Sequence, residues 1–338
     1  RLERSTLRAT YWDGPVLGSV LRVVERSRHV STSRGAVDRV AGWMAYEEFA
    51  FPRGGAAGEF DVGPNPDDII DVTMLVATLN FAFTDFDTGR KFEADYKGQT
   101  WSDSLGMFAC LHRALSNGVP LLDGEYLASV TRSDLEGIFR GNIEMPMLDE
   151  RREILNEVGE VLVDRYESRF RRFVRTCAPA MYADGDGLME RLIDEFPRFD
   201  DTSTYHGADV HIHKLAQLGL WTLHMALHDS GEWGLRDLSM MTAFADYIVP
   251  VALEVMGIVE YTPELSNRIA EGVMIERDSD EEVEIRAHTL YATALLTDAV
   301  NALRPADRQL VIPQVDYRLW SKYHATFRPH HLTRTVMY

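Results

Sequence analysis

Asp246 stands out as a residue able to do acid–base or nucleophilic chemistry. It lies four residues before Pro250, in a stretch from Leu238 to Ala252 whose apolar residues have helical spacing. Because a proline ring clashes with the carbonyl four residues earlier, the predicted helix kinks or ends at Asp246 and exposes its carboxylate. Asp is also a favoured N-cap, so a capping role for Asp246 near Pro250 is an equal alternative.

Histidines in the same region have spacings that suggest a metal site without completing one. His224 and His228 share a predicted helical face, but Met225 stands where the zinc-protease motif needs a Glu as its general base. His211 and His213 point to different sides of a helix. We therefore expect solvated or hydrogen-bonded histidines and no metal ion.

Other motifs with established chemistry are missing. The sequence contains no glycine-rich phosphate loop, no Gly-x-Ser-x-Gly elbow and no dinucleotide fingerprint, which argues against kinases, α/β-hydrolases and Rossmann enzymes. The stretch Asp184–Gly187 resembles part of a calcium loop but lacks the closing Glu, so an ordinary turn or cap is expected there. The sequence predicts no cofactor.

The elements that must position Asp246 are two helices joined by a turn that contains glycine. Asp209 is predicted to cap a helix over residues 210–228, and Asp237 is predicted to cap the second helix. Residues 209–256 are therefore predicted to form a helix-hairpin-helix segment that carries the candidate carboxylate.

Helical spacing dominates the rest of the chain, which predicts a mainly α fold. Ser31–Ser33 offers N-caps for one helix, Thr262-Pro263 begins another, and a long helix from Glu282 to Leu303 buries one apolar face. The apolar stretch Val72–Phe83 runs into a turn and is predicted as a strand, the best candidate for a small β element. No linker separates independent domains, so residues 1–338 are expected to form a single compact α-helical catalytic unit, possibly with two lobes.

Composition limits the classes of partner. The chain has 338 residues, 45% of them hydrophobic, and its 35 Lys and Arg against 53 Asp and Glu give a net charge of −18. The apolar fraction predicts a packed globular protein. Proteins that bind nucleic acid gain affinity by neutralising phosphates, so this charge argues against DNA or intact tRNA and allows only a local basic pocket.

Two features bear on location. The longest stretch without Asp, Glu, Lys or Arg, Leu215–His228, is shorter than the roughly 20 residues that span a bilayer, and no secretory signal follows the basic residues 1–10. The only cysteines, Cys110 and Cys177, form no CxxC motif. We expect a cytoplasmic protein without a membrane partner.

Nine short blocks of the sequence resemble the queuosine salvage protein family, in the same order from about Trp43 to Tyr338. The blocks are Asn80-Phe81-Ala82-Phe83, Phe139-Arg140-Gly141, Glu150-Arg151-Arg152, Phe196-Pro197-Arg198-Phe199, Lys214-Leu215-Ala216-Gln217, Thr242-Ala243-Phe244-Ala245-Asp246-Tyr247, Glu282-Val283-Glu284-Ile285-Arg286, Asp316-Tyr317-Arg318-Leu319-Trp320 and the ending from Pro329 to Tyr338. Because the blocks extend over nearly the whole chain, the resemblance is more specific than any single block.

The resemblance implies an all-α fold related to helix-hairpin-helix DNA glycosylases. It also implies an N-glycosidase that releases queuine from queuosine 5′-phosphate for salvage into tRNA modification. In this family the Asp of the Phe-Ala-Asp-Tyr block is the catalytic carboxylate, which corresponds to Asp246, and its Phe, which corresponds to Phe244, contacts the base. Asp316 corresponds to a residue implicated in base recognition. Relatives carry a His near the helix of Trp43 where this chain has Glu47, a candidate substrate contact that departs from the family pattern.

The chemistry of such a reaction suggests roles for these side chains. Positive charge builds on the ribose as the base leaves, so a carboxylate such as Asp246 stabilises or attacks the anomeric carbon, or activates water. Phe244 and Trp320 suit stacking on a flat base, with core packing the alternative for Trp320. A carboxylate such as that of Asp316 can pair with the cationic amine of queuine.

The phosphate of the substrate needs cationic contacts. By charge alone the candidates are Lys214, Lys322, His324 and Arg334. Lys214 is alternatively a catalytic residue that lies beside Asp246 and keeps it ionised, since an adjacent cation lowers a carboxylate pKa.

Two other classes of protein remain. A damage-specific DNA glycosylase would share the helix-hairpin-helix segment, but the turn around Trp233 contains Asp229 and Glu232 with only Arg236 nearby. A queuine-binding protein without catalysis would keep the pocket and have no need of Asp246.

Overall fold

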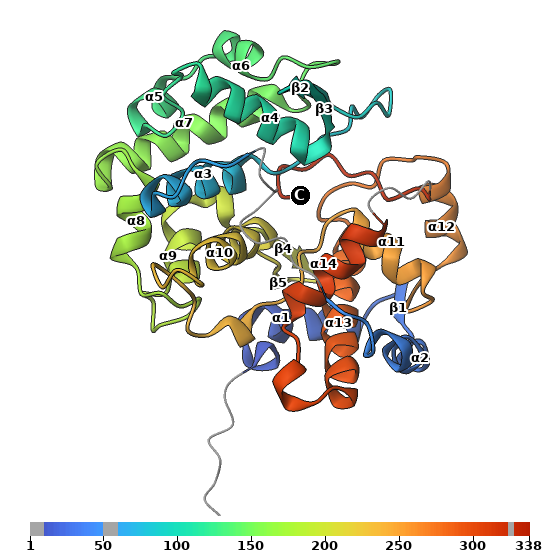
Figure 1. Ribbon diagram of the computed structural model, residues 1–338. Helices are drawn as coiled ribbons and strands as arrows, with labels where there is room; N and C mark the ends of the chain where they lie inside the picture. Colours follow the sequence, from blue (N-terminus) through green and yellow to red (C-terminus); the bar gives the residue numbers. More distant parts are fainter. Residues whose placement is uncertain (1–9, 50–59, 324–327) are drawn as a thin grey trace, which may run out of the picture. The chain divides into compact units, whose positions relative to one another are not determined.

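The computed structural model describes residues 10–49, 60–323 and 328–338, and it is predominantly helical (Figure 1). It is 55% helical, with 14 α-helices and three two-stranded antiparallel sheets in the described ranges. The predicted mainly α class is therefore confirmed. Within these ranges, no helix is both long and apolar enough to cross a membrane.

The chain divides into two compact units, and it passes between them several times. Of the described residues, 10–49, 202–213, 237–323 and 328–333 belong to the first unit, and 60–201, 214–236 and 334–338 belong to the second. The expectation that residues 1–338 act as one catalytic unit stays a prediction.

The first unit is built around the long helix α13 (Asp280–Leu303), which packs against four other helices (Figure 1). These are α1 (Pro15–Val24), α2 (Arg34–Met44), α11 (Ile248–Val255) and α14 (Ile312–Tyr323). The unit also contains α12 (Pro263–Ala270), the 3-10 turns η1 (Tyr11–Asp13), η3 (Leu238–Met240) and η4 (Ala306–Arg308), the paired strands β1 (Val30–Thr32) and β6 (Val259–Tyr261), and the hairpin of β4 (Thr202–Tyr205) and β5 (Ala208–His211).

Two apolar clusters fill this unit, and α13 contributes to both. Its residues Ile285, Ala292, Leu296 and Val300 lie in one cluster with residues of α2, α11 and α14, whereas Val283, Ala287, Leu290 and Ala294 lie in the other with α1 and β5. The predicted apolar face of this helix is confirmed except at Leu303, which is 52% exposed because it is the last residue of the helix.

The second unit is also helical, with one small hairpin. It contains α3 (Pro66–Leu79), β2 (Glu93–Tyr96), β3 (Gln99–Ser102), α4 (Asp103–Ser116), α5 (Gly124–Ser129), α6 (Arg132–Ile138), α7 (Leu148–Arg165), α8 (Phe170–Thr176), α9 (Leu188–Glu195), η2 (Pro197–Phe199) and α10 (Lys214–Leu227). Helix α5 packs closely on α7 because Gly159 has no side chain; a Cβ there would overlap the backbone of Ala128. Figure 1 shows these two helices beside α6 and α4.

Some predicted elements are confirmed and others are wrong. The caps at Ser33 and Thr262 accept the expected backbone N–H groups, and their helices follow. The strand predicted over residues 72–83 is wrong: residues 80–83 form neither helix nor strand, and residues 72–79 belong to the helix α3. Its start is defined by Asn65, whose side chain accepts the N–H of Asp67, and by the proline that follows Asn65. An apolar run buried on all sides gives no periodicity that separates helix from strand.

The helix boundaries around Asp246 also differ from the prediction. Asp209 lies in strand β5 and caps no helix, and α10 begins at Lys214. The second helix begins at Ile248 and not at Leu238. Pro250 is the third residue of this helix. The N–H groups of the first turn have no acceptor within the helix, so a proline there removes no helical hydrogen bond.

Candidate active site

Asp246 lies in an irregular segment, residues 241–247, that connects η3 to α11. Ala243 and Ala245 are fully buried in the apolar cluster that α13 shares with α1 and β5. Phe244 and Asp246 alternate with these alanines along the chain. Ala243 and Ala245 thus anchor the segment in the core. Phe244 and Asp246 are the candidate site residues.

The carboxylate of Asp246 is held at the N-terminus of α11. Its Oδ1 accepts the backbone N–H of Ile248 at 2.8 Å and that of Val249 at 3.0 Å. Among the described residues its second oxygen, Oδ2, makes no hydrogen bond. The capping interpretation is confirmed, and because backbone N–H groups and the helix dipole stabilise negative charge, it is compatible with a catalytic carboxylate.

Asp316 on α14 contacts the same segment. Its Oδ2 accepts the backbone N–H of Phe244 at 2.8 Å, and the two residues are 4% and 5% exposed. The residue predicted to recognise the base therefore binds the backbone of the residue predicted to stack on it.

The residue after Asp246 is a protonated phenol whose ring lies beside two imidazoles. The Tyr247 hydroxyl donates to the carbonyl of Thr333 at 2.9 Å, and its ring lies 4.9 and 5.2 Å from those of His330 and His331. Burial raises the pKa of Tyr247 well above its usual value, and the negative charges of Glu282 and Asp246 act in the same direction. Burial also lowers the pKa of His331 to about 3, so this imidazole is neutral at pH 7.

Sequence reasoning gave no role to a buried ion pair beneath this segment. Glu282 and Arg286 are one helical turn apart on α13, with side chains 0% and 1% exposed and their nearest charged atoms 3.9 Å apart. The Arg286 Nε lies 3.4 Å from the carbonyl oxygen of Ala245, at the outer limit of a hydrogen bond. The available signal was the spacing of four residues between two opposite charges in a helix whose residues are mostly buried.

Glu47, a predicted substrate contact, is paired within the protein. The guanidinium of Arg318 meets its carboxylate at two points, 2.6 Å from Oε2 and 2.8 Å from Oε1. This hydrogen bonding, with smaller contributions from the charges of Arg318 and Lys322, holds the pKa of Glu47 below its usual value. Arg318 also stacks on Trp43, 5.7 Å from the ring centroid.

The remaining candidates of the first unit lie on or after α14. Trp320 is partly buried against the apolar cluster of α11 and α13, and its ring is 6.1 Å from that of Tyr317. Lys322 is exposed in the last turn of the helix, and His324 lies outside the described residues. Their roles in stacking and in phosphate binding stay predictions.

Two predicted residues belong to the second unit. Lys214 is the first residue of α10; its backbone N–H donates to Asp201 at 3.2 Å, and the residue is 6% exposed. The guanidinium of Arg334 donates to Glu150 at 2.7 Å and stacks over the ring of Phe86. The predicted pairing of Lys214 with Asp246 stays a prediction.

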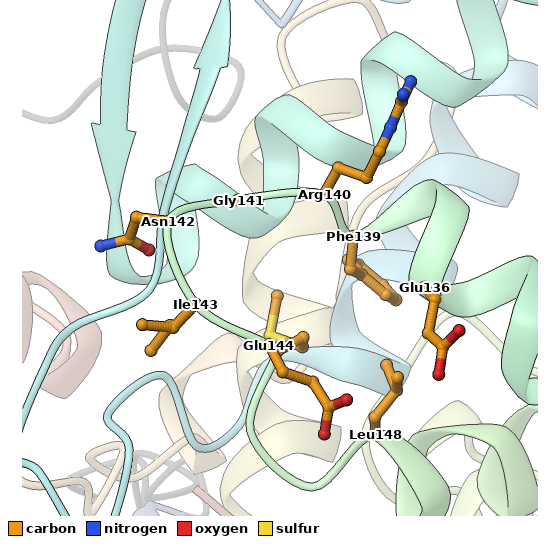
Figure 2. Close-up of a pocket in the computed structure, with 9 residues that line it drawn as sticks. Glu136, Phe139, Arg140, Gly141, Asn142, Ile143, Glu144 and Leu148 are labelled. Carbon is orange, nitrogen blue, oxygen red and sulfur yellow. The ribbon is translucent and has the colours of Figure 1, made fainter.

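A hollow of about 490 Å³ lies on the second unit, between the end of α6 and the start of α7. Figure 2 shows its lining, Glu136, Phe139, Arg140, Gly141, Asn142, Ile143, Glu144, Met145 and Leu148, with the side chain of Arg140 pointing away from it. A Cβ on Gly141 would overlap Phe92 and the carbonyl of Glu93, which explains the glycine of the Phe-Arg-Gly block. None of the described candidate residues lines this hollow, so it is not the candidate site.

The histidines and the acidic loop that suggested metals have other partners. Burial lowers the pKa of His224 to about 4, and its Nδ1 accepts the N–H of Leu235 at 3.0 Å. In the loop at residues 184–187, Glu190 accepts the N–H groups of Ala183, Gly185 and Gly187. The part of the chain that the structure describes holds no group of three His, Cys, Asp or Glu side chains placed to bind an ion.

Comparison with known proteins identifies the family. The sequence profile described as Queuosine salvage protein matches residues 62–338. A protein of Sphaerobacter thermophilus is 34% identical over 96% of this chain and 97% of its own length, and proteins of Bos taurus and Mus musculus are 27% and 28% identical over 95% and 93% of this chain and 93% and 92% of their own lengths. All three are named queuosine 5′-phosphate N-glycosylase/hydrolase. The chain belongs to the queuosine salvage protein family.

Proposed function

We propose that this protein hydrolyses the N-glycosidic bond of queuosine 5′-phosphate and releases queuine. The observation that carries the proposal is the match to the Sphaerobacter protein of that name, 34% identical over 96% of this chain. The carboxylate of Asp246, held at a helix N-terminus in the block that resembles the family's catalytic block, supports it.

The reaction needs a fixed negative charge beside the ribose. As the bond between the anomeric carbon and the base nitrogen breaks, its electron pair goes to the base and the ribose becomes oxocarbenium-like. We assign the stabilisation of this charge to Asp246. Its Oδ1 is engaged by α11, so Oδ2 is the oxygen proposed to approach the anomeric carbon. Water then adds at that carbon, and its proton balances the departing base.

The base needs contacts that stabilise it as it leaves. Queuine is a deazapurine with carbon where a purine has a protonatable ring nitrogen, so protonation of that nitrogen is not available. Stacking on Phe244, with Trp320 as a further candidate, and polar contacts to the base edge therefore carry more of the catalysis. Lys214 and Lys322 remain candidates for the phosphate, whereas Arg334 would first have to leave Glu150.

The acidic surface favours a small substrate. A net charge of −18 repels polymeric DNA and tRNA, while a mononucleotide carries a single phosphate. We propose that the enzyme acts on the free nucleotide, and a cytoplasmic location stays a prediction.

Direct assay of base release tests the proposal. The protein is incubated separately with queuosine 5′-phosphate, unphosphorylated queuosine, queuosine-containing tRNA and DNA with a damaged base, and free base is measured by mass spectrometry. Release of queuine from the monophosphate, with none from either polymer, supports the proposal. Release only from tRNA or DNA contradicts it. Tight binding of queuine without turnover of the monophosphate indicates a binding protein instead.

A further inference from the structure

Asp71 of α3 is a carboxylate buried inside the second unit. The residue is 1% exposed. Its Oδ1 accepts the backbone N–H of Arg171 at 2.7 Å, whereas its Oδ2 has no hydrogen-bond partner among the described residues and lies 3.5 Å from the Arg171 Nε. Burying an ionised oxygen that accepts no hydrogen bond is costly, so the charge of this carboxylate is only partly compensated.

The hydrogen bond from Arg171 attaches α8 to α3. Arg169, which precedes α8, provides no side-chain cap, and the N–H groups of a first helical turn have no acceptor within the helix. Asp71 supplies one from the neighbouring helix. Phe173 and Val174 of α8 are buried, and α8 packs on α3. Helix α8 is therefore held by apolar packing together with a polar contact whose acceptor is titratable.

Burial opposes the ionisation of Asp71 more strongly than neighbouring groups favour it. Burial is the largest influence and raises the pKa of Asp71 to about 6. The N–H of Arg171 and the charges of Arg171 and Arg169 lower this pKa, and the charge of Asp68 raises it. Helices α7 and α10 also pack on α3, but the charged groups that act on Asp71 lie on α3, on α8 and immediately before α8.

We propose that the attachment of α8 to α3 depends on pH through Asp71: α8 is held more firmly when this side chain is protonated and separates more easily when it is ionised. The protonated acid still accepts the Arg171 N–H through Oδ1, and it no longer buries an incompletely compensated charge. The inference concerns a conformational property that lies beyond the proposed function and does not rest on it.

The sign of the effect follows from the two states of the contact. When α8 separates from α3, water reaches Asp71 and its pKa returns towards the ordinary value of about 3.9. Because the pKa is higher in the closed state, the stabilisation by protonation is fully present below about pH 3.9 and is lost as the pH rises through about 6. Between pH 5 and pH 8 the equilibrium constant for separation should therefore rise by about 10-fold.

Hydrogen exchange measured by mass spectrometry tests the proposal. The protection of residues 170–176 is compared with that of α5 in the same unit, at pH 5 and pH 8, after correction for the intrinsic exchange rates. In the wild type we expect this relative protection to fall by about 10-fold. Asp71→Asn keeps an oxygen that accepts the N–H and cannot ionise, so we expect a change of less than about 2-fold.

Asp68→Asn is the matched control. Asp68 lies on the same helix, its side chain is 43% exposed, and its Oδ1 is 3.4 Å from Arg171 Nη1, so the substitution removes a charge near α8 and leaves Asp71 in place. We expect this variant to keep the pH dependence of the wild type. His112 and His224 also titrate in this unit, but they are present in all three proteins and cancel in the comparison.

Three outcomes would overturn the proposal. The first is a fall in protection in Asp71→Asn as large as that in the wild type. The second is the loss of the pH dependence in Asp68→Asn, which would assign it to the general charge of α3. The third needs no variant and decides the question even if Asp71→Asn does not fold: in the wild type, a relative protection of residues 170–176 that is the same at pH 5 and pH 8.

Discussion

Glu47 and Arg318 form an ion pair with two parallel contacts, 2.6 and 2.8 Å long, between the turn that follows α2 and the middle of α14. Both side chains are mostly buried, 32% and 15% exposed. Pairs of this geometry combine charge with directed hydrogen bonds. Glu47, which was predicted to contact the substrate, therefore connects the turn after α2 to α14.

Glu47→Gln is expected to destabilise the protein by about 1–2 kcal/mol at pH 7, because one charged partner is removed from a partly buried hydrogen-bonded pair. The measurement is urea unfolding at pH 7. Glu48→Gln is the matched control; Glu48 is 87% exposed and lies 3.6 Å from Arg308, so we expect no measurable change. Equal midpoints for Glu47→Gln and the wild type would contradict the prediction.

The same pair gives a pH dependence with a definite sign. The pKa of Glu47 is lower in the folded protein than in the unfolded chain, so its stabilisation is fully present above the unfolded value of about 4.3 and is lost as pH falls through the folded value. The difference in unfolding free energy between wild type and Glu47→Gln should therefore shrink below about pH 4. A difference that stays constant from pH 7 to pH 3 would show that this pair does not titrate as its geometry indicates.

The two roles of Asp246 can be separated by substitution. Asp246→Asn keeps the Oδ1 acceptor for Ile248 and Val249, so stability should change little, while base release falls by about 1000-fold or more because the charge is lost. Asp246→Ala should lose the same activity and about 1 kcal/mol of stability as well.

A second cap in the same unit provides the control for Asp246. Thr262 caps α12 by accepting the N–H of Leu265, so Thr262→Ala should cost stability without reducing turnover. Paired measurements of melting temperature and queuine release test all three variants. Turnover near the wild-type level in Asp246→Asn would remove Asp246 from the mechanism.

Local signals in the sequence predicted local structure well. Caps such as Ser33 and Thr262 depend on neighbours only three residues away, and the apolar spacing of α13 depends on one helix. The predicted strand in α3 failed because burial on all sides removes the amphipathic pattern. The helix predicted from Leu238 to Ala252 also failed. The ring of Pro250 was expected to kink or end that helix at Asp246, but Pro250 lies in the first turn of α11, where a proline ends no helix.

Long-range contacts explain what the sequence could not predict. The bond between Asp316 and Phe244 joins residues 72 apart, and no spacing along one element encodes it. Some residues of the blocks that resemble the family have structural roles. Arg151, fully buried, donates to the carbonyls of Pro146, Leu79, Phe81 and Ala82 and so holds together two blocks of the second unit.

Glu284 illustrates a family-block residue with a structural role, and it yields a stability prediction. Its buried carboxylate accepts the N–H groups of Arg28, His29 and Val30 and the hydroxyl of Tyr205, at 2.7–3.1 Å. Glu284→Gln places an amide donor against one of these donors, so we expect a loss of about 2–4 kcal/mol in urea unfolding.

The control for Glu284 lies on the same helix. Glu281 is 23% exposed and pairs with Arg268 at 2.9 Å near the surface, so Glu281→Gln should cost no more than about 1 kcal/mol. Similar losses of stability in the two variants would contradict the prediction. They would show that the contribution of Glu284 to stability does not depend on its burial or on its several hydrogen-bond donors.

The buried imidazole of His288 is expected to make the stability of the folded protein depend on pH. Its Nδ1 lies 2.7 Å from the Thr32 hydroxyl and its Nε2 lies 3.0 Å from that of Ser27, and burial lowers its pKa to about 4. The unfolded chain, with a histidine pKa of about 6.5, binds a proton between these values while the folded protein does not. Stability is therefore fully present above about pH 6.5 and falls as pH drops, by about 1–2 kcal/mol at pH 5 for this residue.

Urea unfolding at pH 7 and pH 5 measures this effect. His288→Gln should lose about 1–2 kcal/mol of the pH-dependent difference, because the titrating group is gone, whatever its effect at pH 7. His331, whose pKa burial also lowers, acts in the same direction and leaves part of the dependence in place. His228→Gln is the control, since that side chain is 60% exposed. If His288→Gln kept the full wild-type difference between pH 7 and pH 5, His288 would not be the buried neutral histidine that its two hydroxyl contacts indicate.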